Sequence, residues 1–460
     1  MIAEAAYRFR WARFHIGELI TGLVEWSSHL SFGVIIISAI VFGWLVAAGW
    51  GAHLSTVLLF MGAMLSAMGV PLAPHIWLKA AASLVALAWI IAGLAAGLAV
   101  GQVTLGYFDL PFLAVAASAI LSTLMSDAPQ VSLGPSETYG DGLLTVLSYV
   151  ATGLAVLHLP GPLRGFLLEG ILAAGAVVGL VAILHAQQVP WARRIGTQFG
   201  WRQDDRPPGT MCNPMHLGGY GILLLPVAIL AGFQAWPWMV AVLLIGAAIV
   251  LAASRTAWAA LVPMAVLWGI HRPPTPEQAV LLAGIGMAAL GLLMTWAWAA
   301  RRMPPDPPKV GVPVDLTPWV WVLRRLTSFD GLGSRWRIWR DVVILWTWRP
   351  VAGWGFNALV ILRDRRFLRL PMQDTLGNFG PGELWVDQAH NEILSWAFST
   401  GILGLAAYAW LWVMAFTHAT NIAVLCGLFG YAIWLLTGWT HLGPANVLYA
   451  FFGLALAGTR

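Results

Sequence analysis

The sequence contains very little charge and almost no lysine. Only 10% of its 460 residues are charged, and lysine occurs only at Lys79 and Lys309. Soluble globular domains average about 25% charged residues, so this composition excludes an ordinary soluble domain. Hydrophobic residues make up 59% of the chain, and the mean hydropathy is +0.77. We therefore expect a protein that crosses the membrane several times, because roughly 20 apolar residues span the hydrocarbon core as a helix.

Cysteine and the common catalytic motifs are also scarce. Cys212 and Cys426 are too few for a disulfide framework, and no CxxC motif occurs. The chain has no HExxH motif, no DxD motif in an extramembrane loop, no P-loop and no serine-hydrolase elbow. The net charge of +5 gives no reason to expect a nucleic acid partner, because almost all polar sequence is short loop. The sequence therefore predicts neither a metal ion nor another cofactor.

Long apolar runs indicate about 13 candidate spans. An even number is needed if the arginine-rich N-terminus and the C-terminus are both cytoplasmic. One of the first six candidates would then be re-entrant or not a span. The predicted fold is an all-α polytopic membrane protein with about 12 transmembrane helices. The candidates lie near residues 33–50, 54–71, 78–100, 110–126, 142–159, 165–187, 215–233, 235–253, 256–271, 279–299, 391–415, 420–438 and 443–458.

The spans and the charges divide the chain into four predicted segments. Residues 1–28 form a basic segment on the membrane surface, and residues 29–299 form an N-terminal transmembrane bundle. Residues 300–390 form a large loop that holds more than half of the 25 lysines and arginines, and residues 391–460 form the C-terminal transmembrane helices. Long loops cross the membrane whatever their charge, whereas short basic loops stay in the cytoplasm. We therefore place the large loop outside the cytoplasm.

Within the large loop, "SRWRIWRDVVILWTW" (334–348) has helical periodicity. The following "RPVAGWGFN" (349–357) contains a proline and two glycines that end a helix. We expect an amphipathic helix at the membrane interface, before the last three spans. The apolar side chains predicted to share one face are Trp336, Trp339, Val343 and Trp346.

Three arginines adjoin membrane segments on the predicted extracytoplasmic side. Arg255, in "AASRTAW", has almost no loop around it. An arginine at membrane depth is costly and usually has a partner or a bound anion, although it could equally snorkel and cap a helix hairpin. Arg206 precedes the turn in "RPPGTMCNP", and Arg335 leads the amphipathic helix, where Arg337 could meet lipid phosphate. Arginine forks suit pyrophosphate oxygens, so we infer an anionic, membrane-borne ligand.

His390 opens a predicted span and lies between two carboxylates, Asp387 and Glu392. A histidine near carboxylates can exchange a proton near neutral pH, as a general base that activates a sugar hydroxyl must do. The same polar residues could instead form an N-terminal helix cap, because acidic groups suit that end of a helix. The sequence leaves both interpretations open.

Four motifs occur in a fixed order along the chain. They are "RPPGTMCNP" followed by "GGYGILLLP", then "SRTAW", then "SRWRIWRDVVILWTWRPVAGWGFN", and then "HNEILSWAFSTGILGL". This ordered set resembles the O-antigen ligase and polymerase superfamily. Its members are bacterial inner-membrane proteins with about a dozen helices and a large periplasmic loop before the last few. Where that family often has a second asparagine after "NP", this chain has Met215 and His216.

The resemblance implies residue roles. Arg255 and Arg335 would bind the pyrophosphate of an undecaprenyl-linked glycan, His390 would lie at the catalytic centre, and Arg206 would add supporting charge. The implied reaction is an inverting, metal-independent glycosyl transfer, in which an acceptor hydroxyl displaces the lipid pyrophosphate at the anomeric carbon. The active site would face the periplasm. Further candidates for contact with the substrate are Asn391, Glu392 and Arg337.

The expected function is O-antigen ligation to lipid A-core during lipopolysaccharide synthesis. The expected partners are the glycan donor, the acceptor and membrane lipids. A polymerase remains an alternative, because both groups share these motifs. An inorganic carbon transporter is a second alternative, but transporters have inverted repeats and broken helices with polar residues near the midplane, and these spans show few ionisable midplane residues. A structural scaffold is a third alternative, in which the arginines would be dispensable.

Overall fold

The computed structural model describes residues 53–135, 141–187, 207–280, 330–359 and 388–458, together with residues 189, 192, 284 and 291. Its internal contacts divide the chain into Met1–Val57 and Leu58–Arg460, and the elements discussed below belong to the second unit. All secondary structure in the described ranges is helical, which confirms the predicted all-α class there, whereas the number of about 12 spans stays a prediction. The predicted surface segment 1–28 lies outside the described residues.

The helices coincide with the predicted apolar runs. The first half of the chain contains α3 (Leu54–Met64), the π-helical turn η3 (Leu65–Gly69), α4 (Val70–Leu72), α5 (Ile76–Ala99), η4 (Tyr107–Asp109), α6 (Leu110–Leu124), α7 (Pro129–Leu133), α8 (Leu143–His158) and α9 (Gly161–Ala186). The second half contains η6 (Gly209–Met211), α10 (Pro214–Gln234), α11 (Pro237–Ala252), α12 (Arg255–His271), α15 (Asp330–Trp348), α17 (Glu392–His418), α18 (Ile422–Leu435) and α19 (Pro444–Ala457).

Six described helical segments are long and apolar enough to cross a membrane, judged by length and composition, and four further apolar helices are shorter. Large apolar side chains such as Ile91, Phe166 and Val262 are exposed on the helices. Exposure of this kind is unfavourable in water and neutral in hydrocarbon. The helices therefore have the surface of a membrane protein. The span predicted near 33–50, and most of the one near 279–299, lie outside the described residues.

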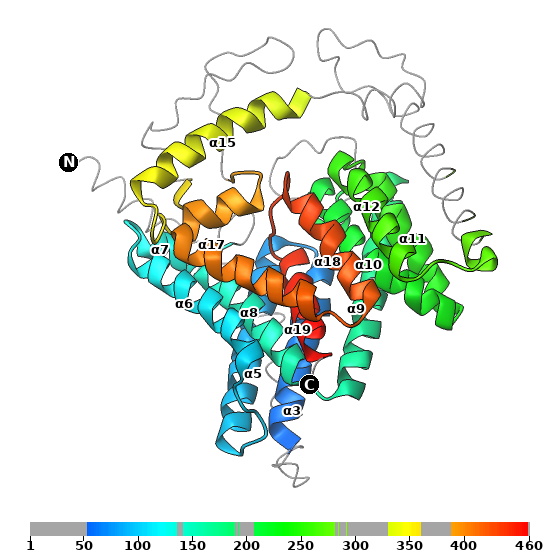
Figure 1. Cartoon of the computed structure of the whole chain (residues 1–460), viewed down its shortest axis with the longest axis horizontal. Coiled ribbons are helices and arrows are strands. Elements are labelled where there is room, and N and C mark those ends of the chain that lie inside the picture. The colour runs from blue at the N-terminus through cyan, green and yellow to red at the C-terminus, as the bar shows by residue number, and fades with distance from the viewer. Residues whose placement is uncertain are drawn as a thin grey trace. The chain divides into compact units, whose positions relative to one another are not determined.

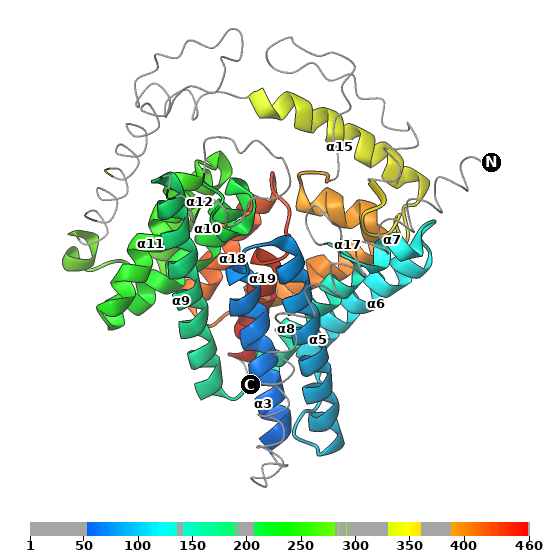
Figure 2. The same cartoon turned by 180° about the vertical axis from the view of Figure 1, so that it is seen from behind.

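Helix α19 forms the centre of the bundle (Figures 1 and 2), where it contacts α8, α17 and α18. A buried network of polar side chains ties it to its neighbours. Asn446 Nδ2 donates to Ser66 Oγ at 2.7 Å, Ser83 Oγ donates to Ser148 Oγ at 2.7 Å, and the hydroxyls of Ser66 and Thr152 bond to each other. An unsatisfied polar group in hydrocarbon costs several kcal/mol, so the network fixes how these helices pack.

Helix α17 is broken at Gly401, whose φ of 66° and ψ of −166° are not helical. The break leaves backbone N–H and C=O groups of α17 without helical partners, and backbone groups of the segment 350–355 form hydrogen bonds with them. The break is therefore filled by protein. A Cβ on Gly401 would lie 2.1 Å from Val351 O, which explains why only glycine fits there. The backbone hydrogen bonds are Trp354 N to Phe398 O at 2.9 Å, Gly355 N to Ser399 O at 2.9 Å and Ile402 N to Pro350 O at 2.8 Å.

Helix α15 lies across one end of the bundle, beside the start of α17 (Figures 1 and 2). The helix predicted over 334–348 is thus confirmed, and two side chains of the face predicted to lie at the membrane interface are exposed. Trp336 and Val343 are 67% and 39% exposed. The helix has a second apolar stripe beside this face, with residues spaced i, i+4 and i+7, and this second stripe packs on Trp354. The buried residues of that stripe are Ile338, Val342 and Leu345.

Candidate active site

The motif "GTMCNP" forms the turn that starts α10. Asn213 caps the helix, because its side-chain oxygen accepts from Met215 N at 2.8 Å. Thr210 Oγ1 donates to Pro71 O at 2.7 Å and anchors the turn to the end of α4. The turn thereby fixes the first residues of α10, including His216. The His216 ring is fully buried, with its centroid 4.7 Å from that of Trp439.

The motif "SRTAW" forms the hairpin between α11 and α12. Ala253 ends α11 in the left-handed region, and Ser254 caps α12, whose first residue is Arg255. Helix α10 approaches this turn closely at Gly218, where a Cβ would lie 2.9 Å from that of Ser254. Thr256 Oγ1 bonds the hydroxyl of Thr437. The position of Arg255 therefore depends on α10 and on the connection between α18 and α19.

The motif "HNE" forms the start of α17. Asn391 is the cap: its Oδ1 accepts from Leu394 N at 3.0 Å, and its Nδ2 donates to Leu436 O at 2.8 Å. His390 is therefore not needed for capping. Its Nδ1 is buried without a hydrogen-bond partner among the described residues, and its ring centroid lies 4.5 Å from that of Trp439.

Glu392 holds the connection 436–443 in place. Its carboxylate is buried and accepts from Thr440 N at 2.8 Å, Thr440 Oγ1 at 2.7 Å, Trp396 Nε1 at 3.0 Å and Tyr408 OH at 3.3 Å. Three of these donors bond Oε1 and one bonds Oε2, so both carboxylate oxygens are held by protein. Trp439 adjoins Thr440 and is fixed with it.

Backbone strain marks each of the four motifs. Among the described non-glycine residues, only Cys212, Ala253, Asn357 and His390 have a positive φ, between 47° and 61°. Cys212, Asn357 and His390 each belong to a different motif, and Ala253 immediately precedes "SRTAW". A non-glycine residue in this region costs of order 1–3 kcal/mol and persists where the surroundings over-determine it, as they often do at functional sites.

The three residues predicted to be catalytic come together in space. Burial lowers the pKa of the Arg335 guanidinium, and the charge of Arg255 lowers it further. Burial, followed by the charge of Arg335, lowers the pKa of His390 to about 4. Charges shift each other's pKa only at short range, so Arg335 lies near both Arg255 and His390, and two cations and a neutral imidazole share one site. Arg335 Nη2 also lies 3.7 Å from Met215 Sδ.

Three buried rings complete the site and were not predicted. The ring centroids of His441 and His216 lie 3.7 Å apart, and Trp439 lies between His216 and His390 in a continuous row. Burial lowers the pKa of His441 to about 3, so this ring is neutral at physiological pH. Two sequence signals point to these residues: the departure from the family pattern at 215–216, and the aromatic and polar turn "TGWTHLGP" between the last two spans.

The remaining predicted residues have different outcomes. Asn391 and Glu392 lie next to His390, but their polar atoms contact protein, as described above. Arg206 and Asp387 lie outside the described residues. Arg337 belongs to α15, but its side chain is not among those described. Within the described ranges, no group of three or more His, Cys, Asp or Glu side chains gathers in a way that could hold a metal ion.

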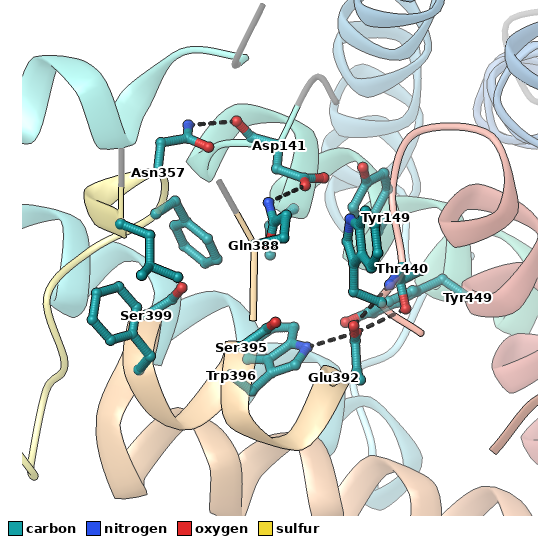
Figure 3. A pocket seen from close by; sticks show the side chains of 15 residues that line it. Asp141, Tyr149, Asn357, Gln388, Glu392, Ser395, Trp396, Ser399, Thr440 and Tyr449 are labelled. Atoms are coloured by element: carbon teal, nitrogen blue, oxygen red, sulfur yellow. Dashed lines mark hydrogen bonds between the residues drawn. The ribbon is translucent and has the colours of Figure 1, made fainter. Parts of the chain in front are cut away.

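A pocket adjoins this site (Figure 3). Trp439 lines the pocket and contacts His390, so it is a wall shared with the arginine and histidine site. Asp141 accepts from Gln388 Nε2 at 3.1 Å through its carboxylate, and from Asn357 Nδ2 at 2.6 Å through its backbone oxygen. These bonds fix the polar side of the pocket.

Comparison with known proteins supports the resemblance drawn from the motifs. Residues 240–409 match the family model described as O-antigen ligase. The resemblance to the O-antigen ligase and polymerase superfamily is confirmed. The matched range contains Arg255, Arg335 and His390, whereas His216 and Trp439 lie outside it. A comparison with curated proteins finds no match. The family and the apolar helices together indicate a membrane enzyme of O-antigen ligase or polymerase type.

Proposed function

We propose that this protein transfers a glycan from undecaprenyl pyrophosphate to a hydroxyl group of an extracytoplasmic acceptor, and that the acceptor is lipid A-core. The protein would lie in the bacterial inner membrane with its active site on the periplasmic side. The observation that carries the proposal is the convergence of Arg255, Arg335 and His390 within a segment that matches the O-antigen ligase family.

The two arginines would bind the leaving pyrophosphate. Arg255 and Arg335 repel each other in a partly buried site, and a diphosphate between them would remove this repulsion. Guanidinium groups donate pairs of hydrogen bonds to phosphate oxygens. Negative charge grows on the pyrophosphate as the glycosidic bond breaks, so the arginines stabilise the transition state more than the ground state.

His390 would act as the general base. The acceptor oxygen attacks the anomeric carbon on the face opposite the pyrophosphate, which inverts the configuration. The hydroxyl proton moves to an imidazole nitrogen, and the electrons of the broken C–O bond leave with the pyrophosphate. Without donor, His390 is neutral and a weak base, because burial and Arg335 lower its pKa to about 4. A bound diphosphate would offset the charge of Arg335 and strengthen this base.

The other predicted residues would have supporting roles. Asn391 and Glu392 would position the connection 436–443 through their hydrogen bonds to Leu436 and Thr440. Arg206 and Arg337 would add positive charge near the donor, as the resemblance implies.

Reconstitution tests the proposed function. Purified protein in vesicles would receive a lipid-linked glycan together with lipid A-core, and gel electrophoresis would follow transfer to the core. We expect transfer that survives a chelator, with inversion at the anomeric carbon seen by NMR. Longer lipid-linked glycans formed from donor alone would identify a polymerase instead. No product with either acceptor would refute glycan transfer.

A transporter was a rival interpretation, and helix α17 is broken as a transporter helix would be. The break at Gly401 does not favour that alternative, however, because backbone groups of the segment 350–355 occupy it.

A further inference from the structure

The pocket beside Trp439 contains polar groups that the protein itself leaves unsatisfied. Tyr449 is 2% exposed, and its hydroxyl has no hydrogen-bond partner among the described residues. The buried Oγ of Ser395 also has none. Both residues line the pocket (Figure 3). A buried hydroxyl without a partner costs about 1–3 kcal/mol, which is the cost that a bound ligand with matching groups removes.

The charges of the lining exclude a phosphate ligand. The lining includes the carboxylates of Asp141 and Glu392, and none of its described residues is Arg, Lys or His. An anion would be repelled here, whereas hydroxyl groups could donate to the Asp141 carboxylate and accept from the Gln388 amide. The polar side of the pocket therefore suits an uncharged ligand rich in hydroxyls.

The remaining walls are aromatic. Trp396, Trp439 and Phe356 line the pocket together with Tyr149. The ring of Trp396 is held by its bond to Glu392 and by stacking on Tyr408, with centroids 4.6 Å apart. Rigid aromatic surfaces beside a few fixed polar groups are typical of small-molecule sites. The C–H faces of a pyranose ring pack on such surfaces.

We propose that this pocket is a saccharide subsite, which holds one uncharged sugar ring across Trp439 from the diphosphate site. Aromatic walls contact the apolar faces of the sugar, while Asp141, Gln388, Ser395 and Tyr449 bond its hydroxyls. The sugar belongs to the donor glycan or to the acceptor, and in this respect the proposal rests on the proposed function.

Removal of one hydroxyl tests the subsite with little effect on folding. Tyr449→Phe deletes a group that has no hydrogen-bond partner among the described residues, so the thermal midpoint should stay within a few degrees of wild type. Tyr220→Phe is the matched control: Tyr220 is also 2% exposed with an unpartnered hydroxyl, but it does not line the pocket. Ser395→Ala is a second, independent variant of the same design.

Calorimetry on the purified full-length protein would measure the binding of two probes, a lipid-free core oligosaccharide and a lipid-free repeat-unit oligosaccharide. We expect one of them to bind wild type, with a Kd about three- to tenfold weaker in Tyr449→Phe and unchanged in Tyr220→Phe. The probe whose Kd weakens in Tyr449→Phe shows whether the sugar belongs to the acceptor core or to the donor glycan. Equal Kd values in wild type, Tyr449→Phe and Ser395→Ala would overturn the subsite, as would failure of both probes to bind.

The two proposals fail in different ways. Glycan transfer in the reconstituted system, together with unchanged Kd values in the pocket variants, would refute the subsite and leave the proposed function intact. Saccharide binding that weakens in Tyr449→Phe, without transfer from any lipid-linked donor, would support the subsite and refute the proposed function.

Discussion

Trp439 has two polar neighbourhoods of opposite character. On one side lie Arg335 and His390, where cations dominate and the imidazole is neutral. Trp439 also lines the pocket with Asp141 and Glu392, which carries carboxylates and neutral hydroxyls. Charges interact strongly in a partly buried environment, so this difference is the physical basis for proposing a diphosphate at the first site and an uncharged sugar in the pocket. Two adjacent sites of this kind suit a substrate in which a sugar and a diphosphate are covalently joined or must meet.

Removal of a charged or basic group from the arginine and histidine site should have the largest effect on the transfer rate. We expect Arg255→Ala, Arg335→Ala and His390→Ala each to lower the transfer rate by about 10²–10⁴-fold, because each removes transition-state stabilisation or proton transfer. Initial rates in vesicles would measure this.

Arg340→Ala is the matched control, because Arg340 is exposed on the same helix and bonds the adjacent Asp341. A similar loss of rate in that variant would show that general surface charge, and not the site, is responsible. Transfer at wild-type rates in any of the three site variants would remove that residue from the mechanism.

Removal of the Glu392 hydrogen bonds that keep Trp439 in place should affect both the site of Arg335 and His390 and the pocket. We expect Glu392→Ala to lower the transfer rate about tenfold and to reduce the thermal midpoint, because two donors from Thr440 lose their partner in a buried environment. Kinetics with donor and acceptor varied separately would measure the effect on each side.

Glu392→Gln keeps an oxygen acceptor at this position and should recover part of the rate. A Glu392→Ala variant with unchanged KM values for both substrates and full activity would argue against a positioning role.

A substitution at the break in α17 should affect the pocket more than the site of Arg335 and His390. The segment that fills the break leads into Phe356 and Asn357, which line only the pocket. We expect Gly401→Ala to cost about 1–3 kcal/mol of unfolding free energy, because its φ is positive and a Cβ would meet Val351 O. Thermal unfolding would measure this cost.

Gly246→Ala is the control for that variant. A Cβ there meets nothing within 4 Å, and the change should be neutral or slightly stabilising in α11. Equal thermal midpoints of the two alanine variants would contradict the close packing at Gly401. Saccharide binding should weaken in Gly401→Ala more than donor binding does.

The pH dependence should show the smallest change in rate. His390 must be neutral to accept a proton, so activity falls as pH decreases through its pKa. For free enzyme this pKa is about 4, and kcat/KM should therefore stay nearly constant from pH 7 to pH 5 and fall only near pH 4. The acid limb of kcat should lie at higher pH, because bound donor raises the pKa. An acid limb of kcat/KM near pH 6.5 would show that Arg335 does not act on His390.

The structure also shows which features of the fold can be predicted from the local sequence. The positions of the helices follow from apolar runs of a certain length, so the boundaries of spans such as Pro214–Gln234 were predicted within a few residues. The family resemblance selected Arg255, Arg335 and His390 as candidate site residues, whereas position alone left a snorkelling arginine and a helix cap as alternatives. The face by which α15 packs was not predicted, because two apolar stripes on one helix are equivalent until a partner surface selects one.

The amino-acid sequence by itself determined that this chain is helical, that it belongs in a membrane and that its arginines and histidine gather at motifs with a family resemblance. Only the tertiary structure decided that Asn391 is the helix cap, that Glu392 holds the connection 436–443, and that Trp439 contacts His390 and also lines a pocket. Helix formation in a membrane depends on residues close together in the chain. Contacts between Trp439, His216 and His390 depend on the packing of three distant segments, for which a single sequence carries no distance information.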